Sequence, residues 1–186
     1  MYSPPLEVEK VHRGFAMKNC TTNCKCNSAS SLMKVTIRPA RMSDVKDIHS
    51  LLQQFANKGL LLGRSFSSLY DQLRDFVVFD DNGLQGVCAL HICWENLAEI
   101  RSLAVADQHQ GKGIGRQLVY SCLDEAWSLE IGQVFTLTYQ SAFFKKLGFT
   151  DIEKNDLPHK IWSDCLQCPK FPDCDEEALV WTAEKK

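Results

Sequence analysis

The segment 110–115, Gln-Gly-Lys-Gly-Ile-Gly, has the composition of a loop that binds an anion. It follows an apolar stretch that ends at Val105 and precedes a long amphipathic pattern, so we expect it to join a strand to a helix. The first N–H groups of a helix have no partner within the helix, and the helix dipole adds positive charge there. Glycines let a phosphate approach these groups closely. The segment therefore predicts a pyrophosphate site; its spacing fits neither a P-loop nor the dinucleotide fingerprint, and an ordinary glycine-rich turn is the alternative.

A carboxylate and a guanidinium stand two residues apart in the apolar stretch 98–105. Alternation along a strand places Glu99 and Arg101 on one face, together with positions 103 and 105. Charged groups on the face of a central strand are costly unless they meet a ligand or each other. Glu99 is therefore a candidate general base, and a Glu–Arg pair without chemistry is the alternative.

Nine cysteines form three groups along the chain. The middle group lies in apolar segments and is predicted to be buried and inert. In the last group, the two-residue spacing of Cys165 and Cys168 lets two thiolates meet one metal, with Cys174 as a third ligand. Zinc is the simplest metal, with His159 or an N-terminal cysteine as the fourth ligand, while an iron–sulfur cluster, a disulfide or free thiols stay open. The groups are Cys20, Cys24 and Cys26; Cys88, Cys93 and Cys122; and Cys165, Cys168 and Cys174.

The composition indicates a globular protein with one core. The chain has 186 residues, of which 45% are hydrophobic and 24% charged, and this balance argues against a largely disordered chain. The net charge of −2 argues against nucleic acid or a membrane as the main partner. The sequence shows neither a run of about 20 apolar residues nor a secretory signal. We therefore expect a cytoplasmic protein.

Strand and helix patterns alternate from residue 33 onward, whereas residues 1–32 have no sustained period. We therefore expect a cysteine-containing N-terminal extension (1–32) and a single domain (33–186) with a cysteine-rich segment at 157–176. Asn82-Gly83 predicts a hairpin turn, and Ser43 is expected to cap the first helix. The order of elements predicts an α/β fold in which helices flank a mixed, mostly antiparallel sheet. The expected strands are 35–38, 76–79, 84–94, 98–105, 134–137 and 178–182, and the expected helices are 45–55, 67–73, 113–129 and 141–146.

Three motifs resemble those of one family and occur in that family's order. The glycine-rich loop Gln110-x-x-Gly113-x-Gly115 resembles the pyrophosphate loop of the GNAT superfamily of acetyl-CoA-dependent N-acetyltransferases. Residues 37–44 resemble its opening strand and helix, and residues 143–149 its later helix–strand unit. The resemblance implies the GNAT fold, acetyl-CoA as co-substrate, and a splayed parallel ladder that receives the pantetheine arm. The coenzyme contacts it implies are Leu103, Ala104, Val105, Gln110, Gly111, Lys112, Gly113, Ile114, Gly115 and Arg116.

Finer features resemble the N-acetylglutamate synthases within that superfamily. They include residues 62–65, 98–105 and 137–140, while residues 157–162 with the cysteine tail resemble short-form bacterial members. The resemblance implies acetylation of the α-amino group of L-glutamate, the first step of arginine biosynthesis, by direct attack in a ternary complex. Longer members carry an amino-acid-kinase-like domain for which this chain has no room, so the arginine-binding role of that domain is not carried over.

The resemblance also implies roles for single residues. Glu99 falls on the glutamate that resembles the base of those synthases. Many GNAT enzymes protonate the leaving thiolate with a tyrosine where this chain has Phe144, so Ser141 and Tyr139 are the candidates, with a mere helix cap as the alternative. Glutamate carries two carboxylates, and the planar fork of arginine is their preferred partner. The candidates for binding them are Arg64, Arg101 and Lys160, while Arg74 fits a solvated surface charge better.

Two other functions stay open. The sequence also fits a GNAT enzyme for another small amine or a protein N-terminus, and it fits a non-catalytic module that senses acetyl-CoA or an amino acid. A sensing module would keep the phosphate loop but would not need Glu99. A homodimer is compatible with the sequence, which does not define the oligomeric state.

Overall fold

The computed structural model describes residues 36–157 and 174–183. These residues belong to one compact unit, Met33–Lys186, built on a seven-stranded sheet in the order β1-β2-β3-β4-β5-β7-β6. The strands are β1 (Thr36–Pro39), β2 (Phe76–Asp80), β3 (Leu84–Trp94), β4 (Leu97–Val105), β5 (Gln133–Thr138), β6 (Thr150–Asp151) and β7 (Glu177–Thr182). Several predicted site residues lie outside the described residues, namely Cys20, Cys24, Cys26, His159, Lys160, Cys165 and Cys168.

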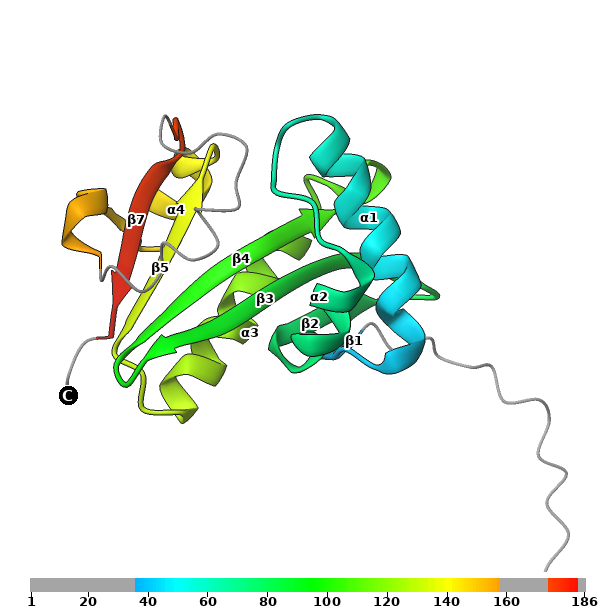
Figure 1. Cartoon of the computed structure of the whole chain (residues 1–186), viewed down its shortest axis with the longest axis horizontal. Coiled ribbons are helices and arrows are strands. Elements are labelled where there is room, and N and C mark those ends of the chain that lie inside the picture. Colours follow the sequence, from blue (N-terminus) through cyan, green and yellow to red (C-terminus); the bar gives the residue numbers. More distant parts are fainter. Residues whose placement is uncertain (1–35, 158–173, 184–186) are drawn as a thin grey trace, which may run out of the picture. The chain divides into compact units, whose positions relative to one another are not determined.

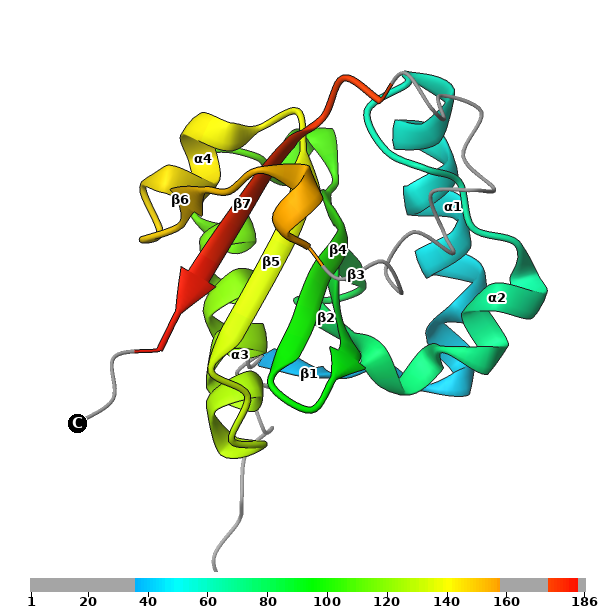
Figure 2. The same ribbon diagram turned by 60° about the vertical axis from the view of Figure 1, so that its left-hand side comes forward.

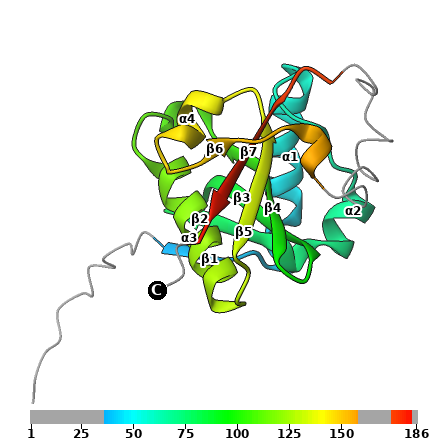
Figure 3. The ribbon, with the colours of Figure 1, turned by 90° about the vertical axis from the view of Figure 1, so that its left-hand side faces the viewer.

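Helices lie on both faces of the sheet. α3 and α4 lie on one side, and α1 and α2 cover the other side (Figures 1, 2 and 3). One core cluster joins α3 to the sheet through residues such as Leu118 and Cys88, and a second joins α1 to it through residues such as Ile48 and Val78. The predicted α/β fold is thereby confirmed. The helices are α1 (Val45–Asn57), α2 (Phe66–Asp71), α3 (Ile114–Ser128) and α4 (Ser141–Lys145), with 3-10 turns η1 (Met42–Asp44), η2 (Leu73–Asp75), η3 (Asp107–His109) and η4 (Lys154–Asp156).

Neighbouring strands pair antiparallel except for β4 and β5, which are parallel. The β2–β3 hairpin turns at Asn82 and Gly83, whose φ angles of 57° and 128° are those that asparagine and glycine tolerate, as the sequence predicts. The β4–β5 ladder ends at the pair Glu99 and Phe135, although β4 continues to Val105. The two strands therefore diverge toward their C-terminal ends, and this splayed ladder confirms the expectation (Figure 1).

The first helix begins at a buried carboxylate and not at the predicted cap. Ser43 is exposed, and Asp44 occupies the N-cap position of α1. The Asp44 carboxylate accepts hydrogen bonds from the Arg41 N–H (2.7 Å) and from the Arg38 guanidinium (2.7 and 3.0 Å). Arg38 also donates to Asp80 at 2.8 Å and 3.1 Å, and it lowers the pKa of both carboxyl groups. A buried carboxylate needs such partners, so this network fixes the start of α1.

The second helix is shorter than the predicted span 67–73. α2 ends at Asp71, and the chain continues into the turn η2. Ser65 caps α2, because its hydroxyl accepts a hydrogen bond from the Ser68 N–H at 3.2 Å. The turn that follows brings Gln72 and Asp75 to side chains of β3 and β4, which lie close to the candidate site.

Candidate active site

A β-bulge in β4 decides which side chains face the site. The β3–β4 register shifts by one residue after Arg101, and Ser102 has a positive φ of 55°. An extra residue reverses the alternation of a strand. Glu99 and Arg101 therefore lie on the side of α1 and α2, whereas the side chains at 103 and 105 pack with the α3 cluster. The prediction that all four share one face is wrong for this reason.

The glycine-rich segment forms the predicted loop between β4 and α3. Gly111 and Gly113 have positive φ angles of 75° and 80°, a backbone that glycine adopts without strain. The first hydrogen bond of α3 runs from the Gln117 N–H to the Gly113 carbonyl at 3.1 Å. The N–H groups of residues 114–116 precede that bond, so they have no partner within the helix. This arrangement has the backbone geometry of the anion cradle that the sequence predicts, and phosphate binding there stays a prediction.

The loop is fastened to the end of β4 by the side chain of Gln110. Its amide donates to the Val105 carbonyl (3.0 Å) and to the Asp107 carboxylate (3.1 Å). Gln110 therefore shapes the loop in this structure, a role that its place in the motif alone does not reveal. The side chains of Lys112 and Arg116 are exposed beside the cradle and add two positive charges to it.

Glu99 belongs to a cluster of polar side chains on the α1–α2 side of the sheet. Its carboxylate lies 3.6 Å from the Arg101 guanidinium, and the two side chains are only 18% and 8% exposed. Arg101 also donates to the Gln72 side chain at 3.0 Å and lies 3.7 Å from the Asp75 carboxylate. That carboxylate in turn contacts the His91 ring nitrogen Nδ1 at 2.7 Å. The cluster holds Glu99 and Arg101 near each other, at the point where β4 leaves β5.

The sequence analysis did not single out Gln72, Asp75 or His91. Strand alternation over residues 84–94 could have placed the side chain of His91 on one face with that of Ala89. The register of the β3–β4 ladder then sets His91 opposite Glu99. Gln72 lies between α2 and η2, and Asp75 ends η2. No periodicity marks the side that such a short 3-10 element presents.

The two candidate hydroxyls are held by carboxylates that precede or begin β7. The Tyr139 hydroxyl donates to Asp175 at 2.7 Å, and the Ser141 hydroxyl donates to Glu177 at 2.8 Å. The N-cap of α4 is Gln140, no side chain of the described residues forms a cap bond there, and the hydrogen bond of the Ser141 hydroxyl is the one to Glu177. Phe144, which the resemblance sets at the position of the tyrosine of many GNAT enzymes, is buried in the core.

Arg64 lies half-buried in the loop that joins α1 to α2, on the same side of the sheet as Glu99. Cys174 is half-buried, and its thiol lies 3.7 Å from the Glu176 carboxylate. Within 36–157 and 174–183, no group of three or more His, Cys, Asp or Glu side chains could hold a metal. The zinc site stays a prediction, since Cys165 and Cys168 lie outside these ranges.

The middle cysteines are mostly buried, as predicted. Cys88 and Cys122 have no exposed surface, and the hydrogen bond between Cys122 and Cys88 together with burial raises the pKa of the Cys122 thiol. Cys93 is only half-buried, and its thiol donates to the His91 carbonyl at 3.5 Å. The prediction of full burial is wrong for Cys93, which packs only partly buried against a small third core cluster, while its neighbour Trp94 is exposed.

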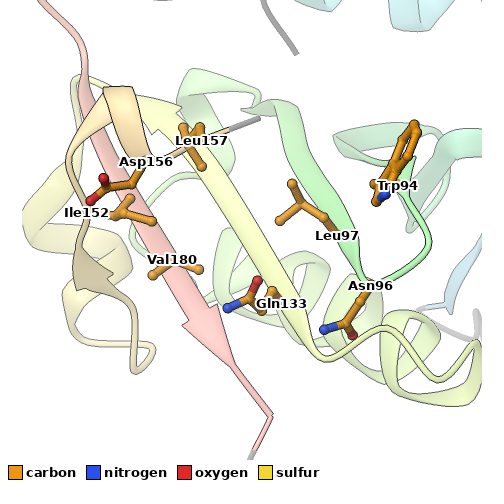
Figure 4. A pocket seen from close by; sticks show the side chains of 8 residues that line it. All are labelled: Trp94, Asn96, Leu97, Gln133, Ile152, Asp156, Leu157 and Val180. Atoms are coloured by element: carbon orange, nitrogen blue, oxygen red, sulfur yellow. The ribbon is translucent and has the colours of Figure 1, made fainter. Parts of the chain in front are cut away.

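A separate hollow lies at the opposite ends of β4 and β5 from the phosphate loop (Figure 4). Apolar side chains form much of its wall, and amide and carboxyl groups stand at its rim. It contains no predicted site residue. Its lining residues are Trp94, Asn96, Leu97, Gln133, Ile152, Asp156, Leu157 and Val180.

Known proteins are similar to this chain in sequence and in fold. The family described as "Acetyltransferase (GNAT) domain" matches residues 72–151. An uncharacterized N-acetyltransferase of Chlorobaculum tepidum is 42% identical over 147 residues, which are 78% of this chain and 95% of the relative. An amino-acid acetyltransferase of Mycobacterium tuberculosis is 36% identical over 132 residues, which are 69% of this chain and 75% of the relative.

A solved structure extends the comparison. N-acetylglutamate synthase from Neisseria gonorrhoeae, complexed with coenzyme A and N-acetyl-glutamate, has a TM-score of 0.74 and 27% identity, with 82% of this chain and 36% of that chain covered. The fold, the anion cradle and these relatives define an acetyl-CoA-dependent N-acetyltransferase. The chain belongs to the GNAT family. In the described part of the chain, no helix combines the length and the apolar composition of a membrane span.

Proposed function

We propose that this N-acetyltransferase acetylates the α-amino group of L-glutamate by direct attack on acetyl-CoA in a ternary complex. The proposal rests on the position of Glu99. Its carboxylate is largely buried, and Glu99 is the last residue of β4 that pairs with β5, at the point where the two strands separate. The names of the M. tuberculosis relative and of the gonococcal synthase support an amino acid, and glutamate in particular, as acceptor. This reaction would place the chain at the first step of arginine biosynthesis.

Acetyl-CoA supplies the activated acetyl group, and the loop before α3 fits its anionic end. The N–H groups of residues 114–116 would bind the pyrophosphate, while Lys112 and Arg116 neutralise charge. The part of β4 beyond Glu99 has no β5 partner in the described sheet, so its backbone is open to the pantetheine amides. The reactive thioester would then lie between the two diverging strands.

The reaction needs one proton acceptor and one proton donor. The amine arrives as an ammonium ion and must lose a proton to Glu99 before its lone pair can attack the acetyl carbon. The N–C bond forms, the C–S bond breaks, and the thiolate takes a proton from Ser141 or Tyr139. The acylated nitrogen loses its second proton, which replaces the one that the hydroxyl gave up, so one proton per cycle stays on Glu99. Asp175 and Glu177 orient these two hydroxyls, because each hydroxyl donates to one of the carboxylates.

The acidic acceptor needs cationic partners. Arg101 already contacts Gln72, Asp75 and Glu99, so we assign it first to holding the base. Arg64 and Lys160 are the proposed partners of the glutamate carboxylates, since arginine and lysine side chains bind such groups through charge-assisted hydrogen bonds.

A panel of free amino acids with acetyl-CoA, read by thiol release, tests the proposal. We expect glutamate to give the highest kcat/KM, and Glu99→Gln to lose about 100-fold or more in kcat while it still binds coenzyme A. Glu95→Gln, an exposed carboxylate near the β3–β4 turn, is the matched control. Thiol release with other amines but not with glutamate would refute the acceptor. Coenzyme binding without acetyl transfer to any amine would favour the sensing module.

A further inference from the structure

The proposed reaction releases one proton per turnover, and that proton must leave a largely buried carboxylate. An ammonium ion and a thioester give an amide, a free thiol and one proton, so charge and atoms balance only when this proton reaches the solvent. Glu99 is 18% exposed and lies next to the guanidinium of Arg101, at 3.6 Å. Each cycle therefore requires an exit from Glu99 after the amine has transferred its proton.

His91 is the titratable side chain directly opposite Glu99 in the β3–β4 ladder. Residues opposite each other in an antiparallel pair have Cβ atoms about 4.5–5.5 Å apart and project from the same face. The His91 side chain is 36% exposed, twice the fraction of the Glu99 side chain. Of the two opposite side chains, that of His91 is therefore the more accessible to solvent.

Asp75 fixes the tautomer of the His91 ring. The Nδ1 atom lies 2.7 Å from an Asp75 carboxylate oxygen, which can only accept a hydrogen bond, so Nδ1 carries the hydrogen. In the neutral ring, Nε2 then has the free lone pair and can accept a proton. Asp75 is itself held near Arg101 at 3.7 Å, and Arg101 is held by Gln72. Asp75 from η2 thus contacts His91, and Glu99 of β4 lies opposite it in the ladder. Arg101 of β4 contacts Asp75, and burial together with the charge of Asp75 raises the pKa of Glu125 in α3.

We propose that His91, oriented by Asp75, is a proton-relay residue that accepts the proton from Glu99 at Nε2, directly or through one water, and releases it to solvent. This inference rests on the proposed function, in which Glu99 is the base. No bond of the substrate forms or breaks at His91; a proton moves from the Glu99 carboxyl to Nε2, and the imidazolium then loses it to buffer.

The test compares His91→Gln, His91→Ala and Asp75→Asn with the wild-type chain. These assays use as acceptor the free amino acid with which the wild-type chain releases thiol fastest from acetyl-CoA. Glutamine keeps an N–H donor for Asp75 but cannot carry a second proton, so His91→Gln removes the relay with little change in packing. We expect kcat to fall about 10- to 100-fold, at and below the lower end of the range for acid–base groups. We expect KM for acetyl-CoA to change less than about 2-fold.

Three further readings separate a relay from a structural role. Added imidazole should restore part of the lost kcat in His91→Ala, because the half-exposed site admits a small base. It should not restore Glu99→Gln. The acid limb of log kcat against pH should become shallower in His91→Gln, since one titrating group is gone. His49→Gln, a histidine stacked on Phe66 at 4.0 Å on the α1–α2 layer, is the control and should keep the wild-type profile.

The outcomes also separate this inference from the proposed function. If Glu99→Gln is inactive and His91→Gln keeps the wild-type kcat and pH profile, the relay is wrong and the base stands. If His91→Gln loses activity that imidazole does not restore in His91→Ala, and both coenzyme affinity and melting temperature fall, His91 is structural and the relay is wrong. If Glu99→Gln keeps full activity, the proposed base fails and the relay fails with it.

Discussion

Replacing Gly113 by alanine tests whether the phosphate cradle exists as a fixed backbone shape. Gly113 has φ of 80° and ψ of 6°, the left-handed region in which a Cβ atom clashes with its own backbone. A Cβ atom at this position would lie 3.9 Å from its nearest neighbour, the Arg116 Nη2 atom, so the new methyl group has space around it. The whole cost of the substitution is therefore conformational.

That cost is about 1–2 kcal/mol for an alanine held in the left-handed region. If the loop keeps its shape, the free energy of unfolding falls by this amount, and the melting temperature falls by about 2–8 °C for a chain of this size. If the loop relaxes when no ligand is bound, the same cost appears as coenzyme A affinity that is about 5- to 30-fold weaker. The two losses should add up to about 1–2 kcal/mol.

Urea denaturation and calorimetric titration with coenzyme A measure the two parts separately. Gly148→Ala is the matched control, because Gly148 has a similar φ of 89°, with 3.8 Å to the nearest atom, but lies after α4 and outside the loop. It should lose stability and keep affinity. Gly113→Asn should lose less than Gly113→Ala, since asparagine tolerates the left-handed region better. A Gly113→Ala protein with wild-type stability and wild-type affinity would refute the cradle geometry.

Three further predictions concern the ion-pair network and the site. Arg38→Met should lower the free energy of unfolding at pH 7 by about 1–3 kcal/mol. Because Arg38 lowers the pKa of folded Asp44, this contribution is present above the ordinary pKa of 3.8 and is lost as the pH falls below that value. The stabilities that urea denaturation measures for the two proteins should therefore converge in acid. In single-turnover assays, either Ser141→Ala or Tyr139→Phe should slow acetyl transfer, and if neither does, the thiolate leaves without a protein acid. In steady-state assays, Arg64→Ala should raise KM for glutamate at least about 10-fold more than KM for acetyl-CoA, because a charge-assisted contact with a substrate carboxylate is lost. Equal changes in the two constants would contradict a role of Arg64 in binding the acceptor.

The sequence predicted those features that neighbouring residues determine. The Asn82–Gly83 turn and the loop before α3 depend on positive φ angles, which asparagine and glycine supply locally. α3 was predicted to begin at Gly113 and begins one residue later, because the glycines and the following apolar stripe mark its start. The alternation of strand and helix patterns also predicted the mixed sheet.

Local patterns could not supply the partners of the site residues. Asp175 and Glu177 reach Tyr139 and Ser141 across 36 positions of the chain, through the antiparallel pairing of β5 with β7. The cap of α1 is another example: Ser43 fits the local rule, but the ion pair between Arg38 and the buried Asp44 fixes the helix start instead. Such contacts depend on strand register, which long-range packing sets.

The sequence by itself determined that this chain has a glycine-rich loop at a helix start, a carboxylate on the preceding strand and a mixed sheet to carry them. Tertiary structure alone decided which way that carboxylate faces and what surrounds it. The bulge at Ser102 turns Glu99 and Arg101 away from the residues that follow, and the β3–β4 register sets His91 opposite Glu99. Both follow from the pairing of two strands, and a one-residue change of register moves a side chain to the other face of a sheet.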